Sequence, residues 1–93
     1  MEKGEDRLAV VGERLKQARR FNGYSAANVA ALLGIARSSL SLYEAGKRDI
    51  RLTVLLAMVD LYRVDVRWLL GYTDELTVTA PPQRRIAYLY DEE

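Results

Sequence analysis

Two short segments patterned as helices lie only three residues apart, and this spacing most constrains how the chain can fold. The first, residues 26–33, follows Ser25, a residue type that favours a helix N-terminus, and stops at Gly34. The second, residues 37–45, stops at Gly46. The pattern predicts two short helices joined by a tight turn.

The second of these segments has two distinct faces. Leu40 and Tyr43 share one face, and the opposite face carries Arg37, Ser38, Ser41, Leu42 and Ala45. Two short helices of which the second presents small polar and basic side chains are typical of a helix-turn-helix. Because Ala30 and Gly34 are small, the helices can cross closely, and the second can protrude into a DNA major groove about 12 Å wide.

Three further helices are predicted around this pair. Apolar residues at Val11, Leu15 and Ala18 predict a helix that ends at Asn22-Gly23. Residues 52–62 place five apolar side chains at helical spacing, namely Leu52, Leu55, Leu56, Val59 and Tyr62. A short helix over about 65–70 begins at an Asp65 cap and ends at Gly71.

The expected fold is therefore all-α, with a five-helix domain over residues 1–74 and a short C-terminal extension over residues 75–93. In the extension, Pro81-Pro82 interrupts any regular structure, and residues 83–90 fit a short helix or a strand equally well.

The positive charge is concentrated in one part of the chain. The net charge is only +1, but residues 1–13 carry −2, residues 14–51 carry +6 and residues 52–93 carry −3. A local basic segment can attract phosphates whatever the total charge. An ordinary solvated basic surface is the alternative.

The residue types exclude several kinds of chemistry. With no cysteine and no histidine, the chain has no disulfides, no zinc finger and no histidine acid–base catalyst. We find no nucleophile–base pair, metal-ligand cluster or phosphate-binding loop, so we expect no enzyme, no metal and no cofactor. No signal peptide or membrane span is recognisable, which predicts a cytoplasmic protein without a membrane partner.

Short motifs across residues 10–74 resemble, in their order and spacing, the Cro and lambda-repressor type of helix-turn-helix domain, also called the xenobiotic-response-element family. They are Val11-Gly-Glu-Arg-Leu15, Ala18-Arg19, Gly23-Tyr-Ser25, Val29-Ala30, Leu33-Gly34-Ile35, Ser38-Ser-Leu40-Ser41, Tyr43-Glu44-Ala-Gly46-Lys47-Arg48 and Val64-Asp-Val-Arg-Trp68-Leu-Leu-Gly71. The resemblance implies a lambda-repressor-like fold whose third helix lies in the major groove of a DNA operator.

The resemblance also implies roles for the third helix. Arg37 and Ser38 correspond to the first residues that reach base edges, and Ser41 and Leu42 follow one turn later. Arginine can bond guanine O6 and N7 together, and Leu42 could touch a thymine methyl group. The alternatives are a phosphate contact for Arg37 and a surface leucine without a role for Leu42.

Further residues are assigned by the same resemblance. Ser25, Lys47, Arg48 and Arg51 correspond to phosphate contacts, with a solvated charge run as the alternative for the three cations. Arg19 and Glu44 correspond to a buried ion pair between the first and third helices.

Three positions depart from the family pattern. Ala26 lacks a polar group for DNA, Ala36 cannot cap the third helix through its side chain, and Arg63 replaces a glycine after the fourth helix.

Family members pair to read two half-sites, so we expect a homodimer on a palindromic operator. The apolar residues left over after the core is counted are Trp68, Leu69, Leu76, Val78, Ile86, Tyr88, Leu89 and Tyr90, and all of them except Leu69 are predicted dimerisation residues. An extension that folds back on its own domain is the alternative.

The leading hypothesis is a transcriptional repressor from a phage or mobile element. An antitoxin, a restriction–modification controller or a protein-interaction adaptor without DNA binding are the alternatives, with a toxin or antirepressor as a further protein partner.

Overall fold

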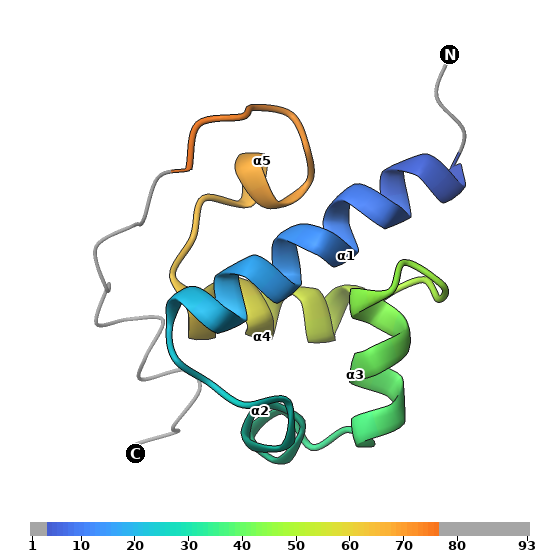
Figure 1. The fold of residues 1–93 in the computed structure, drawn as a ribbon, viewed down its shortest axis with the longest axis vertical. Helices are drawn as coiled ribbons and strands as arrows, with labels where there is room; N and C mark the ends of the chain where they lie inside the picture. The colour runs from blue at the N-terminus through green and yellow to red at the C-terminus, as the bar shows by residue number, and fades with distance from the viewer. Residues whose placement is uncertain (1–3, 77–93) are drawn as a thin grey trace.

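The computed structural model describes residues 4–76, with the side chains of residues 4 and 5 excepted. Five helices follow one another, α1 (Gly4–Phe21), α2 (Ala26–Leu33), α3 (Arg37–Glu44), α4 (Leu52–Tyr62) and α5 (Val66–Leu69), and no strand occurs among these residues (Figure 1). The all-α fold and the five predicted helices are confirmed.

The turn between α2 and α3 follows from its end residues. The Ser25 hydroxyl accepts a hydrogen bond from the amide of Asn28 at 3.0 Å and so caps α2. Gly34 ends α2 in the left-handed conformation, with φ 69°, and the Ile35 amide donates to the Ala30 carbonyl. α3 then begins at Ala36 without a side-chain cap, as its sequence predicts.

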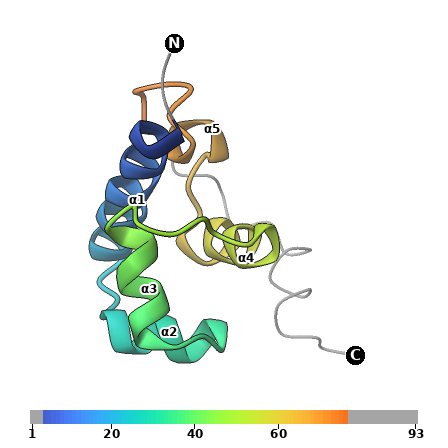
Figure 2. The same ribbon diagram turned by 90° about the vertical axis from the view of Figure 1, so that its right-hand side faces the viewer.

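Two glycines let α1 and the end of α3 meet backbone to backbone. A Cβ atom on Gly12 would lie 2.6 Å from the carbonyl oxygens of Tyr43 and Glu44. A Cβ atom on Gly46 would lie 2.8 Å from the Cα atom of Ala9. Figure 2 shows the upper end of α3 against α1, while the other end projects to α2. α3 is therefore held firmly at one end by the longest helix.

The core takes at least one buried residue from every helix. The predicted stripe of Val11, Leu15 and Ala18 on α1 is buried, together with Val29, Ala30, Leu40, Tyr43, Met58, Val59, Tyr62, Val64, Trp68 and Leu69. The premise that Trp68 and Leu69 are left over after the core is counted is wrong, since Trp68 is only 4 % exposed. Leu76 is exposed. Val78, Ile86, Tyr88, Leu89 and Tyr90 lie outside the described residues.

The apolar face of α4 differs in part from its prediction. Val59 and Tyr62 are buried and Leu55 is partly buried, but Leu52 and Leu56 face solvent. Almost every residue of α4 is apolar, so periodicity alone could not identify which stripe packs against the core.

Arg63 ends α4 in the left-handed conformation, with φ 57° and ψ 45°. It is the one residue other than glycine with a positive φ between residues 4 and 76. A side chain in this conformation costs about 1–2 kcal/mol, which a glycine would not.

None of the helices described combines the length and the apolar character that a membrane crossing requires.

Candidate nucleic-acid interface

α3 is buried along one side and open along the other. Leu40 and Tyr43 pack in the core, while Arg37, Ser38 and Ser41 are exposed. Leu42 is partly buried, at the edge of the open side. The structure thus brings the four predicted base-contacting residues to the outer part of one helix. The serines are short, which would let the helix backbone approach a groove floor closely.

The loop after α3 carries cations that no carboxylate within residues 4–76 neutralises. Lys47, Arg48 and Arg51 are exposed, and no ion pair joins any of them to a carboxylate of the described residues. Arg48 Nη1 donates to the hydroxyl of Ser39 on α3 at 3.2 Å. Arg48 therefore lies back along α3, and Ser39, which sequence reasoning missed, helps to place it. These cations remain available for phosphates.

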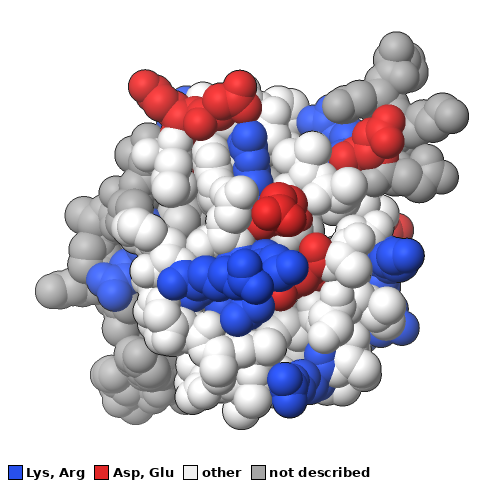
Figure 3. All heavy atoms as spheres, viewed as in Figure 1, with Lys and Arg blue, Asp and Glu red and all other residues white. Residues whose placement is uncertain are grey.

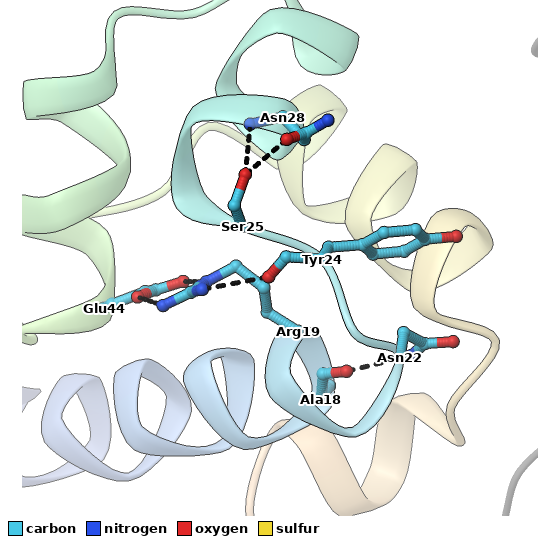
Figure 4. Close-up of polar contacts among 7 residues, drawn as sticks. All are labelled: Ala18, Arg19, Asn22, Tyr24, Ser25, Asn28 and Glu44. Carbon is cyan, nitrogen blue, oxygen red and sulfur yellow. Dashed lines mark hydrogen bonds and ion pairs between the residues drawn. The ribbon is translucent and has the colours of Figure 1, made fainter.

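The start of α2 contributes Ser25, which is exposed. Its hydroxyl bonds both the amide and the side-chain oxygen of Asn28 (Figure 4). Ser25 is thus confirmed as the cap of α2, whereas its contact with a phosphate stays a prediction. Ala26 beside it carries no polar group.

Arg19 and Glu44 form the predicted ion pair between α1 and α3. Arg19 Nε lies 2.8 Å from Oε2 and Nη2 lies 3.0 Å from Oε1 of Glu44, with side chains 12 % and 8 % exposed. Arg19 Nη1 also donates to the Tyr24 carbonyl at 3.1 Å, so one guanidinium joins α1, α3 and the approach to α2 (Figure 4). The hydrogen bonds to Glu44 raise the pKa of Arg19 above its usual value. The pair fixes the orientation of the two helices that carry the candidate interface.

Asn22 joins the end of α1 to the end of α4. Its side-chain amide donates to the carbonyls of Ala18, at 2.9 Å, and of Tyr62, at 3.2 Å. The Tyr62 ring lies 6.3 Å from that of Tyr24, measured between centroids. Burial raises the pKa of the Tyr62 hydroxyl, with a smaller effect from Glu44, so this residue stays neutral beside the ion pair.

Arg14 has a structural role that the net charge of residues 14–51 does not show. Its guanidinium donates to the carbonyls of Trp68 at 2.6 Å and Thr73 at 2.8 Å, and to the carboxylate of Asp74 at 2.9 Å. It also lies over the Trp68 ring, 5.0 Å from the centroid. Arg14 therefore fastens the segment after α5 to α1 and does not belong to the free basic surface.

Basic and acidic side chains occupy partly different areas of the face drawn in Figure 3, although acidic groups also lie beside the basic ones at its centre. Figure 3 shows basic side chains over the C-terminal half of α1 and at the edge formed by α3 and its following loop. Acidic side chains gather at the other end, next to α5. Within the part of the chain that the structure describes, no cluster of acidic side chains could hold a metal ion. The α3 edge is therefore the candidate interface for an anionic polymer.

Comparison with known proteins agrees with this geometry. A domain family described as "Helix-turn-helix domain" matches residues 10–69, which include α2, α3 and their turn. The chain belongs to this family. The predicted membership in its Cro and lambda-repressor type is confirmed.

Several relatives share the same region. The HTH-type transcriptional regulator ImmR of Bacillus subtilis is 41 % identical over 61 residues, which cover 66 % of this chain and 48 % of ImmR. The uncharacterized HTH-type transcriptional regulator YobD of the same organism is 36 % identical over 68 % of this chain and 56 % of YobD. A putative HTH-type transcriptional regulatory protein of Thermococcus gammatolerans is 39 % identical, over 66 % of this chain and 19 % of that protein. The chain thus spans less than two thirds of these relatives.

Proposed function

We propose that this protein is a sequence-specific transcriptional regulator, a repressor that binds a palindromic operator as a homodimer. Arg37, Ser38, Ser41 and Leu42 contact base edges, and Ser25, Lys47, Arg48 and Arg51 contact phosphates. It acts in the cytoplasm, without a cofactor.

One observation carries the proposal: the outer side of α3 is exposed to solvent, while the C-terminal end of the helix is held in place by packing. The core and the glycine contacts hold α3 at its Tyr43–Gly46 end, and the Arg19–Glu44 pair fixes its orientation. At the same time Arg37, Ser38 and Ser41 project into solvent beside unpaired cations. A helix that is held in place at one end, is exposed along one side and has cations at its edge is suited to bind a DNA major groove rather than a small molecule.

The names of relatives favour regulation. ImmR is named an HTH-type transcriptional regulator, and the relative YonR of Bacillus subtilis is named an SPbeta prophage-derived uncharacterized HTH-type transcriptional regulator. The prophage origin in the name of YonR supports a phage or mobile-element origin for this regulator. An antitoxin or restriction–modification controller of the same fold, with a toxin or antirepressor as partner, would use the same DNA surface. The free cations beside α3 argue against an adaptor that has lost DNA binding.

We assign pairing in solution to the C-terminal extension, residues 75–93. It contains Leu76, exposed at the end of the described chain, and the apolar residues Val78, Ile86, Tyr88, Leu89 and Tyr90. A short apolar segment of this kind can be buried against its copy in a second chain.

Selection of bound duplexes from a randomised pool tests the proposal. The wild-type protein should enrich an inverted repeat whose half-sites are about 34 Å, one helical turn, apart. As a matched control, Arg67→Ala removes an exposed arginine that is paired with Asp65 on α5, and it should enrich the same repeat. A pool that stays random after repeated selection would contradict the proposed function.

A further inference from the structure

A leucine stripe on the outer side of α4 is not used by the core of the domain. Leu52 and Leu56 stand one helical turn apart, so their side chains are neighbours, and they are 66 % and 50 % exposed. The opposite side of α4 buries Met58 and Tyr62. Figure 2 shows the loop that joins α3 to the start of α4, where the stripe begins. The stripe therefore lies next to the candidate DNA surface.

Two opposite charges stand directly before this stripe. Asp49 and Arg51 are exposed, and neither side chain makes an ion pair or a hydrogen bond with another described residue. The N-terminus of α4 at Arg51 also has no side-chain cap. A carboxylate from outside the domain would meet both a free guanidinium and an uncapped helix N-terminus there.

We propose that Asp49, Arg51, Leu52 and Leu56, the α4 face, contact the same face of a second copy when both copies lie on neighbouring half-sites. A two-fold contact brings each patch against itself. The leucines pack on the partner's leucines, and Asp49 lies beside Arg51 of the partner subunit, twice over. The guanidinium of Arg51 has five N–H donors, so it can hold this carboxylate together with the phosphate proposed above. A negative charge, a positive charge and an apolar stripe lie together on one small surface. A contact between two identical surfaces requires such a combination, because each charge can then face the opposite charge on the other copy. This inference rests on the proposed function, because each copy must already occupy a half-site.

The size of the face defines what the contact can do. Stable interfaces bury roughly 800 Å² on each partner, and two leucines with two charged residues offer far less. Two copies held on one duplex meet at a high effective concentration, so a small contact suffices there. The α4 face therefore favours one half-site spacing on DNA rather than forming dimers in solution.

The test compares duplexes that contain one half-site, two half-sites at the preferred spacing, and two half-sites moved apart by roughly 5 base pairs, half a helical turn. The double variant Leu52→Gln with Leu56→Gln is uncharged and alters only exposed positions. It should bind the single half-site as the wild type does. Its preference for the correctly spaced pair over the single half-site should fall about tenfold. Leu32→Gln, on α2 and 63 % exposed, is the matched control and should keep the wild-type preference.

Charge exchange supplies a second arm of the test. Asp49→Arg and Arg51→Asp should each reduce the preference for the spaced pair over the single half-site, because like charges then face each other. Arg51→Asp also removes a proposed phosphate contact, so it should in addition weaken binding to both duplexes. The double exchange has the wild-type net charge and should restore the preference.

An unchanged preference in the leucine variant would overturn the inference. An unchanged preference together with a lower melting temperature would also overturn it, and would indicate that residues 77–93 of the same copy cover the α4 face. A wild-type protein that binds all duplexes alike would instead contradict the proposed function.

Discussion

The guanidinium of Arg19 donates two hydrogen bonds to the carboxylate of Glu44, although the two residues are 25 positions apart in the chain. Both side chains are largely buried, so each charge is stabilised by the other instead of by water. The pair connects the longest helix to the helix that we propose reads DNA. Its main consequence is orientation, because a buried ion pair adds little net stability compared with apolar residues of similar size.

Removal of one partner should nevertheless be costly. Arg19→Met leaves the Glu44 carboxylate, only 8 % exposed, without its partner, and the free energy of unfolding should fall. Complete burial would make this loss about 3–5 kcal/mol, and the residual exposure of the pair places it towards the lower end. The double change Arg19→Met with Glu44→Leu should recover much of this loss. Chemical denaturation followed by circular dichroism measures both. A single variant as stable as the wild type would show that water reaches the pair in solution.

Replacement of Arg63 by glycine should stabilise the domain. The residue has φ 57°, and glycine adopts this conformation without the clash that a Cβ atom causes. We expect Arg63→Gly to raise the free energy of unfolding by about 1 kcal/mol. Arg63→Ala is the control: it also removes the charge, but it keeps the Cβ atom and should bring no gain. Equal stabilisation by both variants would assign the effect to the charge instead.

The loop cations should govern the salt dependence of DNA binding. Lys47→Ala should weaken binding to every sequence alike and reduce the slope of log affinity against log salt by about 1. Arg67→Ala, whose arginine already pairs with Asp65, should leave the slope as it is. Fluorescence anisotropy at several salt concentrations gives the slopes. If Lys47→Ala keeps the wild-type slope, Lys47 belongs to the solvated surface.

Truncation after Asp74 tests the role assigned to the extension. The Arg14 hydrogen bonds to Trp68, Thr73 and Asp74 stay intact, so the domain should keep its fold. We expect the shortened chain to sediment as a monomer and to bind the paired half-sites more weakly than the full chain. Analytical ultracentrifugation measures the mass. A truncated protein that stays dimeric and binds as before would contradict pairing through the extension.

Local signals predicted most of the fold. Gly34 and Gly46 mark helix ends because they adopt a left-handed conformation there, and Ser25 and Asp65 mark starts because their side chains cap the next helix. These effects act within a few residues, so they can be read from sequence order alone.

Contacts between distant residues escaped prediction. Arg14 looked like part of a basic surface, but its partners lie 54 to 60 residues away. Trp68 was assigned to a pairing surface because the sequence does not show how much apolar area α1 and α4 leave for it. Leu52 and Leu56 lie at the same helical spacing as residues of the core, and only the packing of α4 shows that they face solvent. The Arg19–Glu44 pair was found despite its separation, through the family resemblance.

The most direct measurement is the effect of Arg37→Ala on a complete set of single base-pair variants of the selected half-site. If α3 reads bases through Arg37, the variant should lose discrimination at one base pair per half-site, at a cost of about 1–3 kcal/mol. Preference at the other positions should remain. A uniform loss of affinity across all base-pair variants would make Arg37 a phosphate ligand and would contradict base reading by the exposed start of α3.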